Sequence, residues 1–183
     1  MCCDTKQNIA AALRRLMEEK PLRKISVQDL MECTNMKRQS FYYHFQDIWD
    51  VVAWICRKQL AAPLLSSDLE FESWLLLALQ LLEADRSFYR KIMQSCTGEQ
   101  ISRFAMPILL PRLAEALFGV GDLQQLTEDQ CFALDLEAKS TIYHISSFVC
   151  SRKEFREDRV ASLLHYLCGL HRPLGEAAPS RVG

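Results

Sequence analysis

The eleven residues from Asn35 to Phe45 combine side chains that can recognise a DNA duplex, in the order Asn-Met-Lys-Arg-Gln-Ser-Phe-Tyr-Tyr-His-Phe. Arg38 has the forked donors that suit guanine O6 and N7, and Gln39 can pair with adenine N6 and N7. Both residues would stand at the start of a helix, where the second helix of a helix-turn-helix meets base edges in the major groove. The pattern predicts sequence-specific binding to double-stranded DNA.

The side chains around this pair suit contacts to the sugar-phosphate backbone, which set the register of a protein on DNA but carry no sequence information. Ser40 can reach either a base or a phosphate. The free amides at the start of the preceding helix, near Ser26 and Val27, offer another binding site for a phosphate. Further backbone contacts are expected from Lys37, Tyr42, Tyr43 and His44.

The elements that must position these residues are predicted to be helices. Helical periodicity recurs along the chain and no long strand-like alternation stands out, so the predicted fold class is all-α. A first helix is expected over residues 5–19, because Pro21 lies just past its end and cannot continue it. Ser26 can cap a second helix, and Asp29 suits the positive end of that helix.

A short turn joins the second helix to the third. Asn35 in this turn tolerates the left-handed backbone conformation that such a turn needs. The third helix, which would be the recognition helix, is expected over residues 37–44. Phe41 and Phe45 lie four residues apart on one face and can anchor this helix to a core.

Helices are also expected through most of the rest of the chain. Asp47 is expected to cap a fourth helix that runs to about Ala61 and is ended by Pro63. Residues 64–67 are then expected to form a hinge or turn. Further helices are expected at about 69–83, 86–95, 99–118, 128–150 and 156–170.

Two local signals bear on the later helices. Pro107 and Pro111 lie inside the 99–118 segment, which should kink or split there. Thr127 and Gln130 form a capping box at the start of the 128–150 helix.

The N-terminal part of the chain, over roughly residues 5–55, resembles the tetracycline-repressor (TetR) type family of bacterial regulators. The resemblance is carried by the opening of the second helix, Ser-Val-x-Asp-Leu from Ser26, and by the aromatic-x-His-Phe end of the third, Tyr-Tyr-His-Phe up to Phe45. The run over residues 38–45 is also similar to the regulators of dihydroxyacetone-kinase operons within that family. Gln46 and Ile48 depart from the family pattern, which often has a basic residue at such positions to grip phosphate.

The resemblance implies two domains with different functions, followed by a tail. Residues 1–50 would form a three-helix helix-turn-helix DNA-binding head, and residues 51–172 a helical-bundle domain for dimerisation and effector binding. Residues 173–183 would be a flexible tail. The implied function is that of a transcription regulator, a repressor that binds a palindromic operator as a homodimer. An unknown small-molecule or protein effector would control it.

The resemblance places the dimer face on the last two long helices, which carry apolar side chains at helical spacing. Packing of the same side chains inside one subunit is the alternative. The residues concerned are Ile142, Ile145, Phe148, Val149, Val160, Leu163, Leu164 and Leu167. An effector pocket could be lined by Trp74, Leu77, Phe88, Met93, Phe104, Met106 and Tyr143, although an ordinary core uses the same residue types.

Composition fits a soluble protein with a DNA-binding end. Nearly half of the 183 residues are apolar, a quarter are charged, and the net charge is -1. Residues 1–58 hold ten Lys and Arg against seven Asp and Glu, whereas the remainder holds twelve against sixteen. The attraction for phosphate therefore lies at the end that carries the motif.

Nothing in the sequence predicts a membrane or secretory protein. The N-terminus lacks a basic stretch followed by an apolar run, and the apolar run over residues 74–79 is far too short to span a bilayer, which needs about 20 residues. The eight cysteines show no CxxC spacing and are expected to be free thiols. We therefore expect a cytoplasmic protein with no cofactor.

The sequence bears on three other functions. An enzyme is disfavoured because no Gly-rich phosphate loop, nucleophile elbow or paired carboxylates are visible. A metal or thiol sensor could use His165, Cys168 and His171, but the two histidines diverge by about 120° on a helix, so no metal site is predicted. The third function is an adaptor or co-regulator that keeps the family fold but has weak or lost DNA binding and acts through protein partners. Gln46 and Ile48 keep this alternative open.

Overall fold

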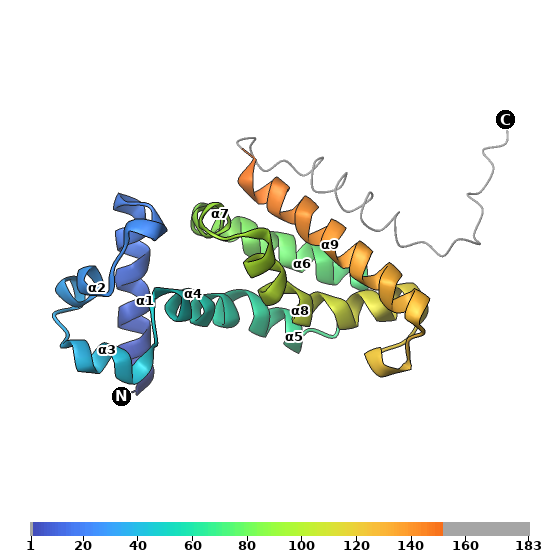
Figure 1. Cartoon of the computed structure of the whole chain (residues 1–183), viewed down its shortest axis with the longest axis horizontal. Helices are drawn as coiled ribbons and strands as arrows, with labels where there is room; N and C mark the ends of the chain where they lie inside the picture. Colours follow the sequence, from blue (N-terminus) through green and yellow to red (C-terminus); the bar gives the residue numbers. More distant parts are fainter. Residues whose placement is uncertain (1, 152–183) are drawn as a thin grey trace.

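The computed structural model describes residues 2–151 of the chain, and within this range it is built from helices without a strand (Figure 1). The all-α prediction is confirmed. The predicted helix at 156–170, the tail at 173–183 and the His165-to-His171 pattern lie outside the described residues. The helices are α1 (Cys2–Glu19), α2 (Val27–Thr34), α3 (Arg38–His44), α4 (Ile48–Cys56), α5 (Ala62–Ser66), α6 (Phe71–Ala84), α7 (Arg86–Ser95), α8 (Gly98–Phe118) and α9 (Glu128–Cys150).

The first three helices and α4 form a small head. Its core is made by large apolar side chains from all four helices, among them Leu13, Leu30, Phe41 and Val51, each at most 1% exposed. The head lies at one end of the molecule in Figure 1, and α4 leads from it into the body formed by α5–α9.

Local capping fixes the turns of the head as predicted. Ser26 caps α2 and forms a capping box with Asp29. Asn35 ends α2 in the left-handed conformation, with φ 52° and ψ 37°. Asp47 caps α4, and its side chain accepts a hydrogen bond from the Asp50 amide. These polar groups satisfy amides that a helix start leaves without partners.

The fourth helix does not end where the sequence predicted. A π-helical turn, η2 (Arg57–Ala61), follows α4, and α5 continues it without a break to Ser66. The expectation that Pro63 ends the helix is therefore wrong. Pro63 stands at the start of α5, directly after the π turn has changed the hydrogen-bond register, and there a proline without an N–H is tolerated. The expected hinge at 64–67 is correspondingly displaced to the residues after Ser66.

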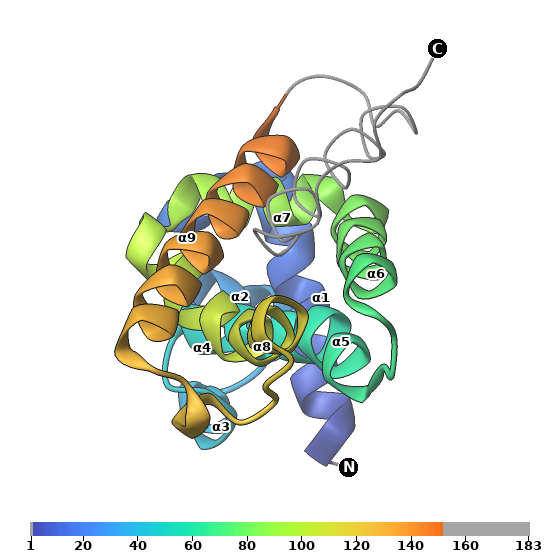
Figure 2. The same cartoon turned by 90° about the vertical axis from the view of Figure 1, so that its right-hand side faces the viewer.

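In the body, α8 and α9 pack along each other and α9 also packs against α7 (Figure 2). Helix α8 runs unbroken through Pro107 and Pro111, so of the two outcomes expected there, a kink or a split, the split does not occur. Thr127 caps α9 in the predicted capping box with Gln130. Two short 3-10 helices, η1 (Leu22–Lys24) and η3 (Leu123–Gln125), complete the elements of the described part.

The apolar side chains that the sequence assigned to a dimer face on α9 pack inside the subunit. Ile142 and Val149 are 8% and 1% exposed, and Ile145 and Phe148 are partly buried against the same cores. The alternative expectation, packing within one subunit, holds for Ile142 and Val149, whereas a dimer face on the rest of α9 stays a prediction. The outer face of α9 instead exposes Phe132, Leu136 and Tyr143.

One apolar core joins the head to α7. Phe88, Tyr89 and Ile92 of α7 belong to the same cluster as the head residues named above. A second cluster, around Leu75, Leu79, Leu113 and Ala138, holds the body together. Among the helices of residues 2–151, none is long and apolar enough to cross a membrane.

Candidate nucleic-acid interface

Helix α3 lies on the outer side of the head, on the far side from α5–α9 (Figure 1). Phe41 and Phe45 hold it there: they are 1% and 3% exposed, and their ring centroids lie 6.1 Å apart. Phe45 also meets Trp54 of α4 edge to face at 6.1 Å. Burial of this face fixes which side of α3 points to solvent, because side chains four apart share one side of a helix.

The leading residues of α3 are exposed, as a DNA-reading helix requires. Lys37 precedes the helix as its N-cap residue, and Lys37, Arg38 and Gln39 are all exposed. Ser40 is half-buried and its amide donates to the Lys37 carbonyl at 2.9 Å. The structure therefore brings the four leading polar residues of the motif together at one end of α3.

The aromatic residues behind them differ in their surroundings. Tyr43 is 81% exposed and meets the half-buried His44 edge to face, with ring centroids 4.9 Å apart. Tyr42 is 46% exposed, and its hydroxyl accepts a hydrogen bond from the Arg38 guanidinium at 3.2 Å. The guanidinium carbon of Arg38 also lies 5.4 Å from the centre of the Tyr42 ring. Tyr42 thus contacts Arg38 through both its hydroxyl and its ring, apart from any contact that Tyr42 makes with DNA.

The start of α2 differs from the sequence expectation of free amides. The Ser26 amide and hydroxyl both donate to Asp29 Oδ2 at 2.7 Å, so the Ser26 amide is not free. Lys20 donates to the other oxygen of this carboxylate at 2.6 Å. These hydrogen bonds, first that of Lys20, lower the pKa of Asp29 to about 2, so it is an anion at neutral pH. Val27 is half-buried, and its suggested phosphate contact stays a prediction.

Sequence reasoning predicted Asp47 as the cap of α4 but missed that Asp50 forms an acidic pair with it. Asp47 accepts from the Asp50 amide at 2.8 Å, and Asp50 accepts from the Gln46 amide at 3.2 Å. Carboxylates therefore occupy the helix start that follows the recognition helix, where they oppose a phosphate. Ile48, between them, packs against the head core. The signal in the sequence was the Asp-x-x-Asp spacing of a helix cap.

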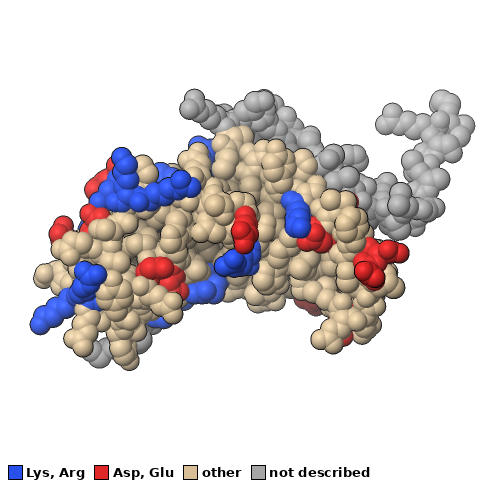
Figure 3. Space-filling view, in the orientation of Figure 1, with Lys and Arg blue, Asp and Glu red and all other residues tan. Residues whose placement is uncertain are grey.

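A basic residue beside the recognition helix was missed as well. Lys6 of α1 places its ammonium 5.3 Å from the centre of the Phe45 ring. The N-terminal end of α1 lies next to α3 in Figure 1. No sequence pattern links Lys6 to the motif, because the two meet only through the packing of α1 on α3. Figure 3 shows further Lys and Arg side chains over the head, intermingled with Asp and Glu.

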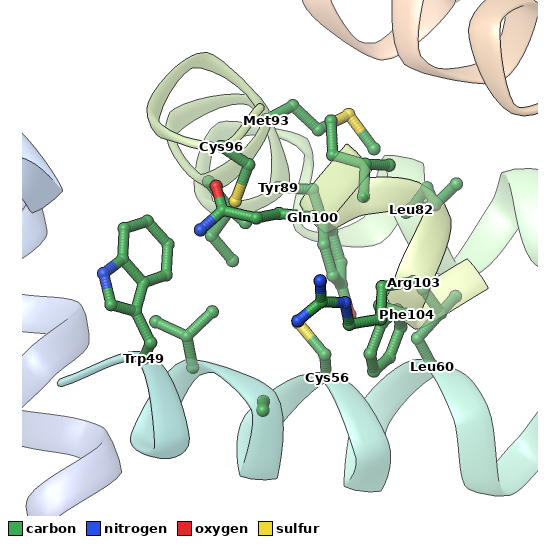
Figure 4. Close-up of a pocket in the computed structure, with 14 residues that line it drawn as sticks. Trp49, Cys56, Leu60, Leu82, Tyr89, Met93, Cys96, Gln100, Arg103 and Phe104 are labelled. Atoms are coloured by element: carbon green, nitrogen blue, oxygen red, sulfur yellow. The ribbon is translucent and has the colours of Figure 1, made fainter. Parts of the chain in front are cut away.

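The suggested effector-pocket residues are brought together in part. Trp74, Met93 and Phe104 line one cavity, and Met93 and Phe104 also line a second (Figure 4). Phe88 is buried in the head core, away from Trp74, and Tyr143 is 69% exposed on α9. Within residues 2–151 no cluster of three or more His, Cys, Asp or Glu could hold a metal ion.

Two proteins with a similar sequence or fold are transcription regulators by name. No family model matches the chain. The chain is 34% identical over 91 residues to the HTH-type dhaKLM operon transcriptional activator DhaS of Lactococcus lactis subsp. lactis (strain IL1403), with 48% of each protein covered. It thus spans about half the length of the curated relative that it matches. A solved structure, of the dihydroxyacetone kinase operon activator DhaS, matches with a TM-score of 0.63 and 22% identity over 91% of this chain and 96% of that one.

The resemblance to tetracycline-repressor-type regulators is confirmed. So is the narrower resemblance to the regulators of dihydroxyacetone-kinase operons, since the curated relative carries that description. At 22% identity the likeness to the solved structure speaks for the helical fold alone. Both similar proteins are named as transcription activators, not as enzymes.

Proposed function

We propose that the chain is a DNA-binding transcription regulator that binds a palindromic operator as a homodimer. The observation that carries the proposal is the exposure of Arg38 and Gln39 at the leading end of α3, a helix that Phe41 and Phe45 fix to the head core. Side chains on an anchored helix can enter a major groove in a defined register. The relative named as an operon activator supports the same reading.

The roles of the site residues follow from their chemistry. Arg38 would read guanine and Gln39 adenine, with Ser40 beside them. Phosphate contacts would come from Val27, Lys37, Tyr42, Tyr43 and His44, and the structure adds Lys6. The amide and the hydroxyl of Ser26 both donate to Asp29, so a phosphate contact of Ser26 would have to replace one of these hydrogen bonds.

The sign of regulation and the effector belong to the proposal too. The sequence predicted a repressor, whereas the curated relative is named as an activator. A reporter gene placed behind the operator, in cells with and without the chain, decides between the two. Residues 51–172 would carry the dimer contacts and an effector site, and residues 1–50 the DNA contacts.

Binding to DNA from the promoter flanking the chain's own gene tests the function. We expect selective binding that weakens steeply between 50 and 200 mM salt, because phosphate contacts release counterions. Arg38→Ala should cost about 1–3 kcal/mol and relax one base preference. Arg103→Ala is the matched control: this arginine is exposed on α8 of the body and pairs with Glu99 at 3.2 Å.

An adaptor with weak or lost DNA binding is the second candidate. The carboxylates of Asp47 and Asp50 at the start of α4 favour the adaptor. Ile48 favours it too, because it packs against the core at a position where a basic residue that binds phosphate would be expected. Absence of selective binding at 50 mM salt, with the chain folded and dimeric, would support the adaptor and reject the regulator.

A further inference from the structure

Two arginines of α7 hold the C-terminal end of α9. Arg86 donates to the carbonyl oxygens of Phe148 at 2.8 Å and of Val149 at 3.2 Å. It also donates to the carbonyl and hydroxyl oxygens of Ser151, the C-cap residue of α9, at 3.2 and 3.0 Å. Arg90, one turn later, donates to the carbonyl oxygens of Val149 at 3.2 Å and of Ser151 at 2.7 Å. We call Arg86 and Arg90 the arginine clamp.

The arginine clamp fixes a direction as well as satisfying a helix end. The last carbonyls of a helix have no partner within it, and a cation beside them is favourable. Arg86 is also only 12% exposed, with its Nε 3.6 Å from Glu83 Oε2 and its guanidinium carbon 5.5 Å from the centre of the Phe148 ring. Because the donors of a guanidinium form a rigid fork, they hold the end of α9 at one orientation against α7.

Helix α7 is attached to the head on its other side. It packs against α9 and also against α1 and η1 of the head (Figure 1). Three of its residues and Val149 of α9 belong to the apolar cluster that anchors α3. Three polar contacts add to this packing: Arg14 pairs with Asp85, Lys91 donates to the Met17 carbonyl at 2.7 Å, and Arg23 donates to the Ser95 carbonyl at 3.1 Å. The orientation of α9 is thereby passed to the head through α7.

Helix α1 turns a small rotation at α7 into a displacement at α3. Its 18 residues span about 27 Å. Lys91 holds it near its C-terminal end, at Met17, whereas its N-terminal end lies next to α3 (Figure 1). A head rotation of about 5° at α7 would move the far end of α1 by about 2 Å. Opposite rotations of the two heads in a dimer would change the separation of the α3 helices by up to about 5 Å, which exceeds the rise of about 3.4 Å per base pair.

We propose that Arg86 and Arg90 are positioning residues for DNA recognition, which fix the separation of the two α3 helices in the dimer and so select operators by half-site spacing. The inference rests on the operator-binding homodimer proposed above, with the two chains in contact along the outer face of α9. Both arginines act through α7 and the head, without contact to DNA. A fixed separation lets the second head bind efficiently at one spacing only, because the effective concentration of that head depends on how well its reach matches the span.

The test varies the spacing between half-sites. The probes are duplexes with the operator from the promoter flanking the chain's own gene, the same operator with one base pair inserted or removed at its centre, and a single half-site. Affinities are measured by fluorescence anisotropy at 100 mM salt, at concentrations where sedimentation shows a dimer. We expect the wild-type chain to bind the native spacing about tenfold more tightly than either altered spacing.

Arg86→Lys and Arg90→Lys keep the charge but lose the fork of donors. Each should weaken binding to the native spacing about fivefold and leave the altered spacings and the half-site nearly unchanged, so that the spacing preference falls to about twofold. Arg103→Lys is the matched control, since this exposed arginine of α8 pairs only with Glu99 among the contacts of the body, and its variant should keep the tenfold preference. Circular dichroism checks the fold; if Arg86→Lys loses its helices, Arg90→Lys carries the test, because Arg90 makes fewer of the hydrogen bonds.

The outcomes separate this inference from the function. Selective operator binding whose spacing preference is the same in both variants as in the wild-type chain would overturn the positioning role and leave the regulator standing. Equal weakening of all four duplexes would show that the arginines only stabilise the end of α9, and would overturn it too. Absence of selective binding by the wild-type chain would reject the regulator and, with it, this role for the arginine clamp.

Discussion

The contact between Arg38 and Tyr42 yields the sharpest prediction about DNA reading. The guanidinium donates to the Tyr42 hydroxyl at 3.2 Å and lies 5.4 Å from the ring centre. Tyr42→Phe keeps the ring and removes the hydroxyl, so Arg38 loses a partner that limits its rotamers before DNA arrives. A hydrogen bond to a charged group is worth about 1.5–3 kcal/mol when it is shielded from water, and the exposure of both groups reduces this one to about 0.5–1 kcal/mol.

The assay is a double-mutant cycle on operator affinity, by fluorescence anisotropy at 100 mM salt. Arg38→Ala alone should cost about 1–3 kcal/mol. Tyr42→Phe alone should cost about 0.5–1 kcal/mol, and in the Arg38→Ala background it should cost less, with a coupling of about 0.5 kcal/mol or more. The cycle cancels any separate phosphate contact of Tyr42. Strict additivity of the two changes would refute the idea that Tyr42 positions Arg38.

Three further predictions concern charge and packing. Lys37→Ala and Lys6→Ala should each flatten the slope of log affinity against log salt by about 0.9; an unchanged slope excludes that lysine from phosphate contact. Asp29→Asn should lower the free energy of unfolding by about 1 kcal/mol at pH 6, and the loss should vanish towards pH 2. The direction of this pH dependence follows from the lowered pKa of Asp29: the stabilisation by its carboxylate is complete above the ordinary pKa of 3.8 and is lost as the pH falls through about 2. Urea titrations that show a pH-independent loss would contradict this prediction. Phe41→Ala should destabilise the head by about 3–5 kcal/mol, measured by thermal unfolding, with Tyr43→Ala as the exposed control that changes little.

Local signals in the sequence predicted the head well. Ser26, Asp47 and Thr127 cap their helices as expected because a cap needs only a side-chain oxygen and the amides two or three residues on. Asn35 adopts the left-handed turn for a similarly local reason. The buried pair Phe41 and Phe45 followed from a spacing of four on one helix.

Errors arose where the outcome depends on distant parts of the chain. Pro63 does not end a helix because the π turn before it shifts the hydrogen-bond register. Ile142 and Val149 pack within the subunit because α7 and α8 cover that face of α9, and periodicity identifies an apolar face without naming what covers it. The position of Lys6 beside the motif could not be predicted for the same reason, since only the packing of α1 beside α3 brings this residue to the motif.

The acidic start of α4 shows how a stabilising feature can oppose a binding one. Asp47 and Asp50 satisfy amides at the junction between α3 and α4, and that junction fixes the angle at which α3 leaves the head. In the proposed complex with DNA, the same carboxylates would repel the phosphate backbone that α3 approaches. Phosphate attraction would then come from Lys37 and Lys6 on either end of α3, while α4 supplies rigidity. A head with weak electrostatic attraction for DNA depends more on base contacts and on the simultaneous binding of two half-sites by the two heads of a dimer. The distance between the heads, and any change that shifts it, would then determine how much of the operator is occupied.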